Sequence, residues 1–324
     1  MNKKLNQISF LSVFAMILVV IGHSHITLEF RELWIFKWVY TFHMPLFFLI
    51  SGFLYAYTNP KGKLEKINSW QFIGKKVKRL LYPFFFINSI IFIIKALAVN
   101  EEQMQHPLSF DFQSYINSML FHPIGFMWFL PALFVIFVLF ISFKRYVYNR
   151  YFPVGVIVLF AISFVFPEVD FFEISSAVYF SGYFALGIVY CRYKEYVDRF
   201  LLKYRYVILL VSFVISTLLL DNQLIAALVG IAFSIVLSLM VEGLCGKRIT
   251  QLSGYTYTVF LLSYFPQMFI SGPIAHVFPT VNQCLLCVVS ALSGFFIPIL
   301  IGIIATKMRT KNRLMKFCTS LIGI

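Results

Sequence analysis

Residues 223–241 read QLIAALVGIAFSIVLSLMV, nineteen consecutive residues without a charged side chain. A segment of about 20 apolar residues is long enough to cross a bilayer as a helix. Similar segments recur through the 324 residues, and charged residues make up only 12% of the chain, against about 25% in a soluble domain. The sequence therefore predicts an all-α membrane protein and excludes a soluble domain with a single anchor.

Ten segments are predicted to be transmembrane helices. They are residues 7–27, 38–57, 80–98, 126–143, 152–167, 175–191, 206–220, 223–241, 255–271 and 281–305. The first segment resembles a signal peptide, but its apolar stretch is long and no small-residue cleavage site follows it. We therefore expect it to be retained as the first helix, and we expect residues 1–324 to form one domain.

The basic residues predict the orientation of this bundle. If the spans alternate, 24 of the 27 Lys and Arg residues fall in segments on one side, namely 1–6, 58–79, 144–151, 192–205, 242–254 and 306–324. Because Lys and Arg collect in cytoplasmic loops, both termini are expected to be cytoplasmic. The same topology accounts for the net charge of +14, so we expect no nucleic-acid partner.

The five cysteines are scattered along the chain. Cys284 and Cys287 are two residues apart, but no second pair accompanies them to complete a metal site. We interpret them as small apolar packing residues and expect no metal ion.

Two histidines lie within predicted spans, His23 near the outer end of the first and His43 near the outer end of the second. Because consecutive helices joined by a short loop are antiparallel, both imidazoles are expected at a similar depth. An imidazole titrates near neutral pH and can take a proton from a hydroxyl and return it. The alternative is that each histidine simply lies at the membrane interface, as tyrosine and tryptophan do.

Other polar groups within or beside the spans are few, and each is costly there and so suggests function. They are Ser24, Ser51, Asn88, Glu242, Ser263, Tyr264 and Gln267. The remaining histidines, His25, His106, His122 and His276, fall closer to water, where an interfacial position is expected. Outer-loop acids such as Glu29 and Glu32 are candidates to fold over the two buried histidines.

A basic segment, KKVKRLLYP at residues 75–83, begins the third span on its cytoplasmic side. Its functional interpretation is a phosphate clamp, because arginine offers a fork of donors and lysine a point charge. The alternative is ordinary anchoring by basic residues. Trp128 lies at the start of the fourth span and is a candidate binding residue. The alternative is that it is an ordinary tryptophan of the membrane interface. A phosphate clamp on one side and a histidine near the other suit a long donor with a phosphate head.

Several motifs in order carry a family resemblance. They are VVIGHS at 19–24, FHMPLFFLISGF at 42–53, KRLLYP at 78–83, MWFLPAL at 127–133 and YFALG at 183–187. Together they resemble the acyltransferase-3 family of bacterial membrane acyltransferases, and within it the surface-polysaccharide O-acetyltransferases, including the fucose-4-O-acetylase-like group.

The resemblance implies about ten helices in a bacterial cytoplasmic membrane. It implies transfer of an acetyl group from cytoplasmic acetyl-CoA, or a similar acyl-CoA, to a hydroxyl of a glycan or polyprenyl-linked sugar. It implies that His23 is the catalytic residue. From the chemistry of imidazole we interpret His23 as the general base, with His43 orienting or polarising. The expected acyl-CoA-binding residues are Lys76, Lys78, Arg79 and Trp128.

Two positions depart from the family pattern. Many members carry an arginine eleven residues before the first histidine, where this chain has Ser12. Many also carry a histidine in a C-terminal Y-L-x-H pattern, where this chain reads Leu262-Ser263-Tyr264. The first departure argues against a mechanism that needs a buried arginine near the base. The second indicates a subgroup and not a loss of activity, because His23 and His43 remain.

Two other classes of function are compatible with a helical bundle. One is a transporter or flippase for lipid-linked saccharides, although such proteins often show internal repeats and broken spans, which are not evident. The other is a structural partner in a polysaccharide export complex, in which His23 and His43 would be inert.

Overall fold

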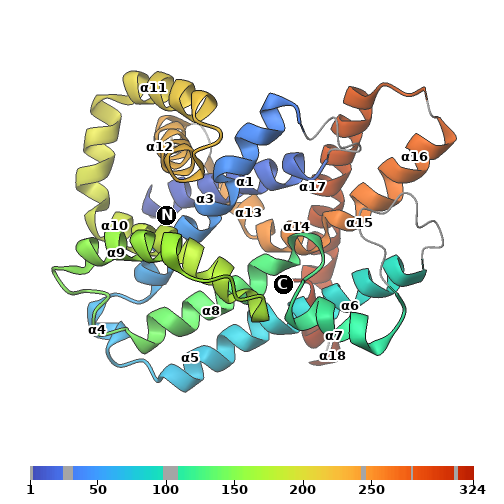
Figure 1. The fold of residues 1–324 in the computed structure, drawn as a ribbon, viewed down its shortest axis with the longest axis horizontal. Helices are drawn as coiled ribbons and strands as arrows, with labels where there is room; N and C mark the ends of the chain where they lie inside the picture. The colour runs from blue at the N-terminus through green and yellow to red at the C-terminus, as the bar shows by residue number, and fades with distance from the viewer. Residues whose placement is uncertain (1–2, 25–31, 98–108, 242–245, 279, 310–312) are drawn as a thin grey trace. The chain divides into compact units, whose positions relative to one another are not determined.

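The structure is a computed structural model and describes residues 3–24, 32–97, 109–241, 246–278, 280–309 and 313–324. All regular structure in these ranges is helical, as Figure 1 shows. The prediction of an all-α protein is therefore confirmed for the described part of the chain.

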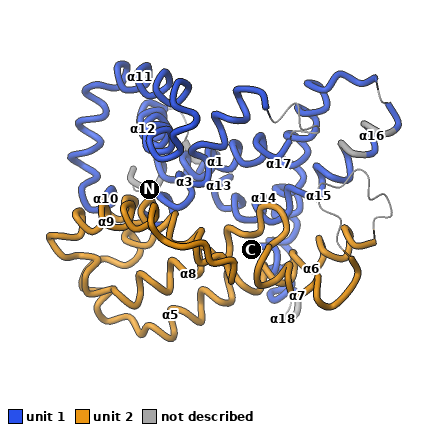
Figure 2. Tube along the Cα trace, viewed as in Figure 1, with its two compact units in different colours: residues 1–54, 190–324 blue, residues 55–189 orange. Residues whose placement is uncertain are grey.

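The chain divides into two compact units, which are coloured separately in Figure 2. Unit 1 contains residues 1–54 and 190–324, and unit 2 contains residues 55–189. The boundaries fall within two long helices, α3 (Trp34–Thr58) and α10 (Ile174–Lys203).

Unit 1 is built around its first helix, α1 (Lys3–Gly22), which packs against α12, α13, α14 and α17. Besides parts of α3 and α10, the unit contains α11 (Arg205–Leu218), α12 (Gln223–Val241), α13 (Gly246–Ser253), α14 (Thr256–Leu262), α15 (Tyr264–Pro266), a π-helical turn (Gln267–Ser271), α16 (Gly272–Val277), α17 (Gln283–Met308) and α18 (Arg313–Leu321). The buried side chains of α1 are mostly apolar, so burial of apolar surface holds this centre together.

Two contacts fix α3 against its neighbours in unit 1. The indole Nε1 of Trp38 donates a hydrogen bond to Ser216 Oγ of α11 at 2.7 Å. Gly230 of α12 lies so close to α3 that a Cβ atom there would be 2.4 Å from Cγ of Phe42. A glycine is therefore needed for α12 to reach this distance from α3.

A buried polar cluster ties α1, α10 and α12 together at the other end of α1. Gln7 donates to the Tyr190 hydroxyl at 2.8 Å and to Ser238 Oγ at 3.1 Å. Tyr190 in turn donates to Asp198 at 2.7 Å, and the second oxygen of that carboxylate pairs with Lys194. Lys194 therefore forms a buried ion pair with Asp198. From the sequence it was predicted only to be one of the basic residues on the cytoplasmic side.

Unit 2 contains α4 (Lys61–Leu64), α5 (Ser69–Lys76), a π-helical turn (Val77–Leu81), α6 (Tyr82–Leu97), α7 (Phe112–Leu120), a 3-10 turn (Gly125–Trp128), α8 (Phe129–Ser142), α9 (Phe152–Val165) and the first half of α10. Asn88 of α6 is fully buried, donates to Ser118 O at 2.7 Å and accepts from Ile124 N at 3.1 Å. Its amide thus closes the loop after α7, which is a structural role.

Six helices or runs of continuous helical turns are long and apolar enough to cross a membrane, judged by length and composition. They are Trp34–Thr58, Ser69–Leu97, Gly125–Ser142, Phe171–Lys203, Gln223–Val241 and Gln283–Met308. Three shorter apolar helices are Asn6–Gly22, Phe152–Val165 and Arg205–Leu218. Multi-pass membrane character is thus supported, while ten crossings and cytoplasmic termini stay predictions.

Most of the predicted spans match helices whose ends are shifted, and the first and ninth spans differ in other ways. The first predicted span, 7–27, extends beyond α1, and residues 25–27 lie outside the described part of the chain. The ninth, 255–271, is broken into α14, α15 and a π-helical turn. Pro266 and Pro273 explain the break, because neither offers an N–H to the carbonyl four residues earlier.

Candidate functional site

His23 lies in unit 1 at the point where α1 ends. His23 N still bonds Val19 O at 3.1 Å, but Ser24 N turns to Ile21 O at 3.0 Å, three residues back. Ser24 is also held by its side chain, which donates to Ile21 O at 2.7 Å. The helix therefore tightens in its last turn, and His23 stands in that turn.

Tyr40 of α3 lies against both predicted histidines. Its hydroxyl donates to Gly22 O at 3.0 Å, which ties α3 to the end of α1. Its ring meets His23 edge-on, with centroids 6.0 Å apart, and meets His43 edge-on at 5.1 Å. The structure thus places both imidazoles beside one tyrosine, whereas the sequence predicted only that they lie at a similar depth.

The imidazole of His43 has a defined tautomer. Its Nδ1 lies 2.8 Å from Val39 O in the preceding turn, and a carbonyl oxygen only accepts, so Nδ1 carries the hydrogen. In the neutral ring Nε2 then carries the lone pair and can accept a hydrogen bond. His43 is 3% exposed and His23 is half-buried, so His23 is the more accessible of the two.

Of the two acids predicted to fold over the histidines, only Glu32 belongs to the described part of the chain. Glu29, His25 and His106 lie outside the described residues. Glu32 is exposed and pairs with Lys37 at 2.7 Å. His122 is exposed in a loop of unit 2, and its position near water stays a prediction.

Gln267 also holds the end of α1. Its Nε2 donates to Val20 O at 2.9 Å, the carbonyl that Ser24 N does not bond. Gln267 is 6% exposed and lies on Gly294 of α17, where a Cβ atom would be 2.8 Å from Gln267 Cγ. The turn of helix that carries His23 is therefore fastened by a buried amide.

The predicted phosphate clamp lies in unit 2 on the π-helical turn Val77–Leu81. Lys78 and Arg79 are exposed on this turn. The turn is wide because Pro83 has no N–H for the Arg79 carbonyl, and Tyr82 N bonds Val77 O instead. Two exposed basic side chains on one turn are suited to binding an anion.

Lys76 occupies a different environment from the other two. Its Nζ lies 3.5 Å from the centroid of Phe137 and 5.2 Å from that of Phe72, and the residue is half-buried. Such contacts are cation–π interactions. The structure therefore separates Lys76, held on aromatic rings, from the exposed pair Lys78 and Arg79.

Trp128 belongs to an aromatic cluster in unit 2. It closes the 3-10 turn before α8, is half-buried and stacks on Phe180 of α10, with centroids 5.4 Å apart and planes 28° apart. Packing accounts for one face of the indole. Its part in binding acyl-CoA stays a prediction.

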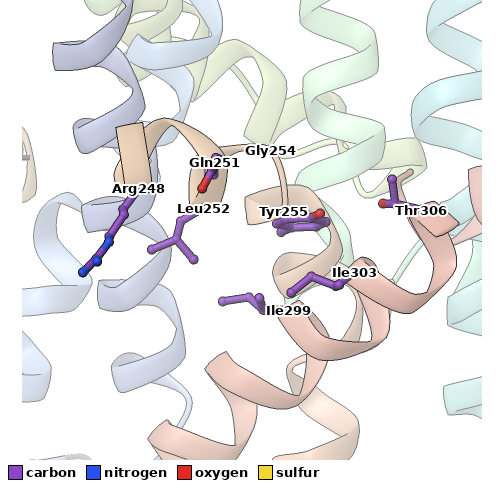
Figure 3. A pocket seen from close by; sticks show the side chains of 8 residues that line it. All are labelled: Arg248, Gln251, Leu252, Gly254, Tyr255, Ile299, Ile303 and Thr306. Carbon is purple, nitrogen blue, oxygen red and sulfur yellow. The ribbon is translucent and has the colours of Figure 1, made fainter. Parts of the chain in front are cut away.

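A pocket of about 650 Å³ opens in another part of unit 1 (Figure 3). Its lining residues come from α13, from α17 and from the turn between α13 and α14, and they are Arg248, Gln251, Leu252, Gly254, Tyr255, Ile299, Ile303 and Thr306. Tyr255 forms a wall by lying on Gly302, where a Cβ atom would be 2.7 Å from its ring. None of the predicted site residues lines this pocket.

Sequence reasoning missed Tyr40 and did not find the partner of Gln267. The signal for Tyr40 was its position three residues before His43, which places both on one helix face. No local signal links Gln267 to Val20, because 247 residues separate them.

Helices of membrane-spanning length, with two histidines beside one tyrosine, define a multi-pass membrane protein with a candidate proton-transfer site. The chain belongs to the acyltransferase-3 family, since residues 5–306 match the family model described as "Acyltransferase domain". It is also 30% identical over 128 residues to the nodulation protein NolL of Mesorhizobium japonicum. That match covers 38% of this chain and only 31% of the relative. No solved structure matches the chain.

Proposed function

We propose that the protein is a membrane O-acyltransferase. It transfers an acetyl or similar acyl group from acyl-CoA to a hydroxyl of a cell-surface glycan or a polyprenyl-linked sugar. Membership of an acyltransferase family gives the reaction class. The observation that carries the residue assignment is the placement of His23 and His43 beside Tyr40 at the end of α1.

His23 acts as the general base in this proposal. One imidazole nitrogen takes the proton of the sugar hydroxyl while the hydroxyl oxygen attacks the thioester carbonyl carbon. A C–O bond forms, the C–S bond breaks, and the CoA thiolate takes the proton back from the imidazolium. The products are the sugar ester and CoA, and His23 is neutral again.

His43 is proposed to assist through its Nε2. Because Nδ1 is held by Val39 O, Nε2 is the nitrogen that can accept a proton or a hydrogen bond from substrate. Burial of His43 limits competing water, which suits transfer to a sugar hydroxyl.

The donor phosphates are assigned to the basic turn of unit 2. Lys78 and Arg79 are exposed there and suit the phosphates of CoA. Lys76, which lies against the ring of Phe137, is proposed to add positive charge. Trp128 is proposed to contact the donor. The proposed location is the bacterial cytoplasmic membrane with this turn in the cytoplasm.

The test is release of CoA from acetyl-CoA by the detergent-purified protein with total membrane glycolipid as acceptor. The variant His23→Ala is expected to lose about a hundredfold or more in rate, the usual size of general-base catalysis. His122→Ala, which changes an exposed histidine of unit 2, is the matched control and should keep wild-type activity. Full transfer by His23→Ala would refute the assignment of His23.

A transporter for lipid-linked saccharides is the second candidate, because the predicted span 255–271 is broken, as spans often are in transporters. Such a protein would move labelled lipid-linked sugar across vesicles without releasing CoA. Acceptor-dependent CoA release by the purified protein decides against it.

A further inference from the structure

The carbonyl of Val20 is the feature that carries a further inference. In a regular helix this oxygen would accept from Ser24 N, but Ser24 N bonds Ile21 O instead. A helix leaves its last carbonyls unsatisfied, and a buried one needs another donor. Gln267 Nε2 supplies that donor at 2.9 Å.

The side chain of Gln267 is held in place by its surroundings. It is buried and lies on the backbone of α17 at Gly294, since a Cβ atom at position 294 would be 2.8 Å from Cγ and 2.9 Å from Nε2 of Gln267. Any larger residue at position 294 would occupy the volume of the amide. Gln267 therefore lies between Gly294 of α17 and the end of α1.

Gln267 lies at an irregular point of its helical segment. Gln267 begins the π-helical turn Gln267–Ser271. This turn precedes Pro273, which cannot donate to Phe269 O. Such turns widen a helix and frequently occur at functional sites. A buried amide within an apolar segment costs free energy, so its presence there suggests a function.

We propose that Gln267 is a positioning residue for His23, which rests on the proposed function of His23 as the base. It does not touch the substrate. It holds the carbonyl of Val20, three residues before His23, and so sets the direction in which the last turn of α1 presents the imidazole. Gly294 contributes to the same positioning, because the absence of a side chain leaves space for the amide of Gln267.

The test compares three variants of the full-length, detergent-purified protein in the CoA-release assay. Gln267→Met keeps the length of the side chain and removes the donor. Gly294→Ala places a methyl group where the amide lies. Gln7→Met is the matched control, since Gln7 is also a buried glutamine that ties α1 to neighbours but lies about 24 Å along the helix from His23.

Gln267→Met and Gly294→Ala are expected to lower kcat by about tenfold to a hundredfold, as small misplacements of a catalytic group do. KM for acyl-CoA should stay unchanged. The NMR resonances of the His23 imidazole should shift in Gln267→Met and not in Gln7→Met. Gln7→Met should lower thermal stability while the folded protein keeps its kcat.

Wild-type kcat and unchanged His23 resonances in folded Gln267→Met would overturn the positioning role, even if His23→Ala is inactive. An equal loss of kcat in Gln7→Met would also overturn it, because the effect would then be general destabilisation. If His23→Ala keeps full activity, the proposed function of His23 fails first, so the two failures are distinguishable. Should Gly294→Ala not fold, Gln267→Met decides alone.

Discussion

The buried ion pair of α10 gives a prediction that does not depend on the reaction. The side chain of Lys194 is 7% exposed and that of Asp198 is 15% exposed, so each charge depends on the other for compensation. Asp198→Ala leaves the Lys194 ammonium buried without its carboxylate and removes the acceptor of Tyr190. Breaking a buried pair on one side costs about 3–5 kcal/mol.

We expect the lower end of this range, about 3 kcal/mol, because Asp198 retains some access to solvent. For a unit of this size, that loss lowers the unfolding temperature by roughly 6 °C or more. The measurement is thermal unfolding of the purified protein in one detergent at fixed concentration. Glu195→Ala, which removes an exposed acid from the same helix, is the control and should change the transition little.

A double variant tests the reason for the loss. Lys194→Met in the Asp198→Ala background removes the uncompensated charge and should recover part of the stability, because apolar replacements of buried pairs are often neutral. If Asp198→Ala unfolds at the wild-type temperature, the pair is not buried as described. If the double variant is less stable than Asp198→Ala, the charge itself is not the cause.

Three further predictions concern the helix contacts and the two candidate sites. Gly230→Ala should destabilise the protein by about 1–3 kcal/mol, measured by thermal unfolding, because its Cβ atom would lie 2.4 Å from Cγ of Phe42. Tyr40→Phe should lower kcat by roughly fivefold, since it loses the bond to the Gly22 carbonyl, worth about 1 kcal/mol, while keeping the ring beside both histidines. Arg79→Gln should raise KM for acyl-CoA several-fold, more at low salt, with kcat nearly unchanged.

Each of these has a control and a contradicting result. Gly62→Ala has open space around its Cβ position and should not change stability as Gly230→Ala does. A Tyr40→Phe enzyme with wild-type kcat would show that the hydroxyl is dispensable. Arg150→Gln removes an exposed basic residue elsewhere in unit 2, and an equal rise in KM there would remove the special role of Arg79.

The sequence predicted an all-helical chain with long apolar helices because apolar runs are local signals. It predicted the ends less well, as with α1, where the last turn depends on Ile21 and Gln267 rather than on composition. The break in the span 255–271 follows from Pro266 and Pro273, which both lack a backbone donor, but no broken span was predicted from the sequence. The width of the turn at Arg79 likewise follows from Pro83.

The sequence identified the candidate histidines of the site, but not the residues that hold them in place. His23 and His43 stand out because ionisable groups are rare in apolar segments. Tyr40 does not stand out in a chain with 18 tyrosines, and the pairing of Lys194 with Asp198 was hidden by the general excess of basic residues. Contacts such as Gln267 to Val20 join distant segments, and only the folded chain reveals them.

The two short helices α9 and α11 have a consequence for the surrounding bilayer. Each contains 14 residues and is therefore about 21 Å long, while the hydrocarbon core of a typical bilayer is about 30 Å thick. If these helices cross the membrane, lipid beside them must thin to cover their ends, at a cost that rises with each ångström of mismatch. Membranes made of short acyl chains would then favour this protein, and lipid chain length would become a determinant of where it accumulates.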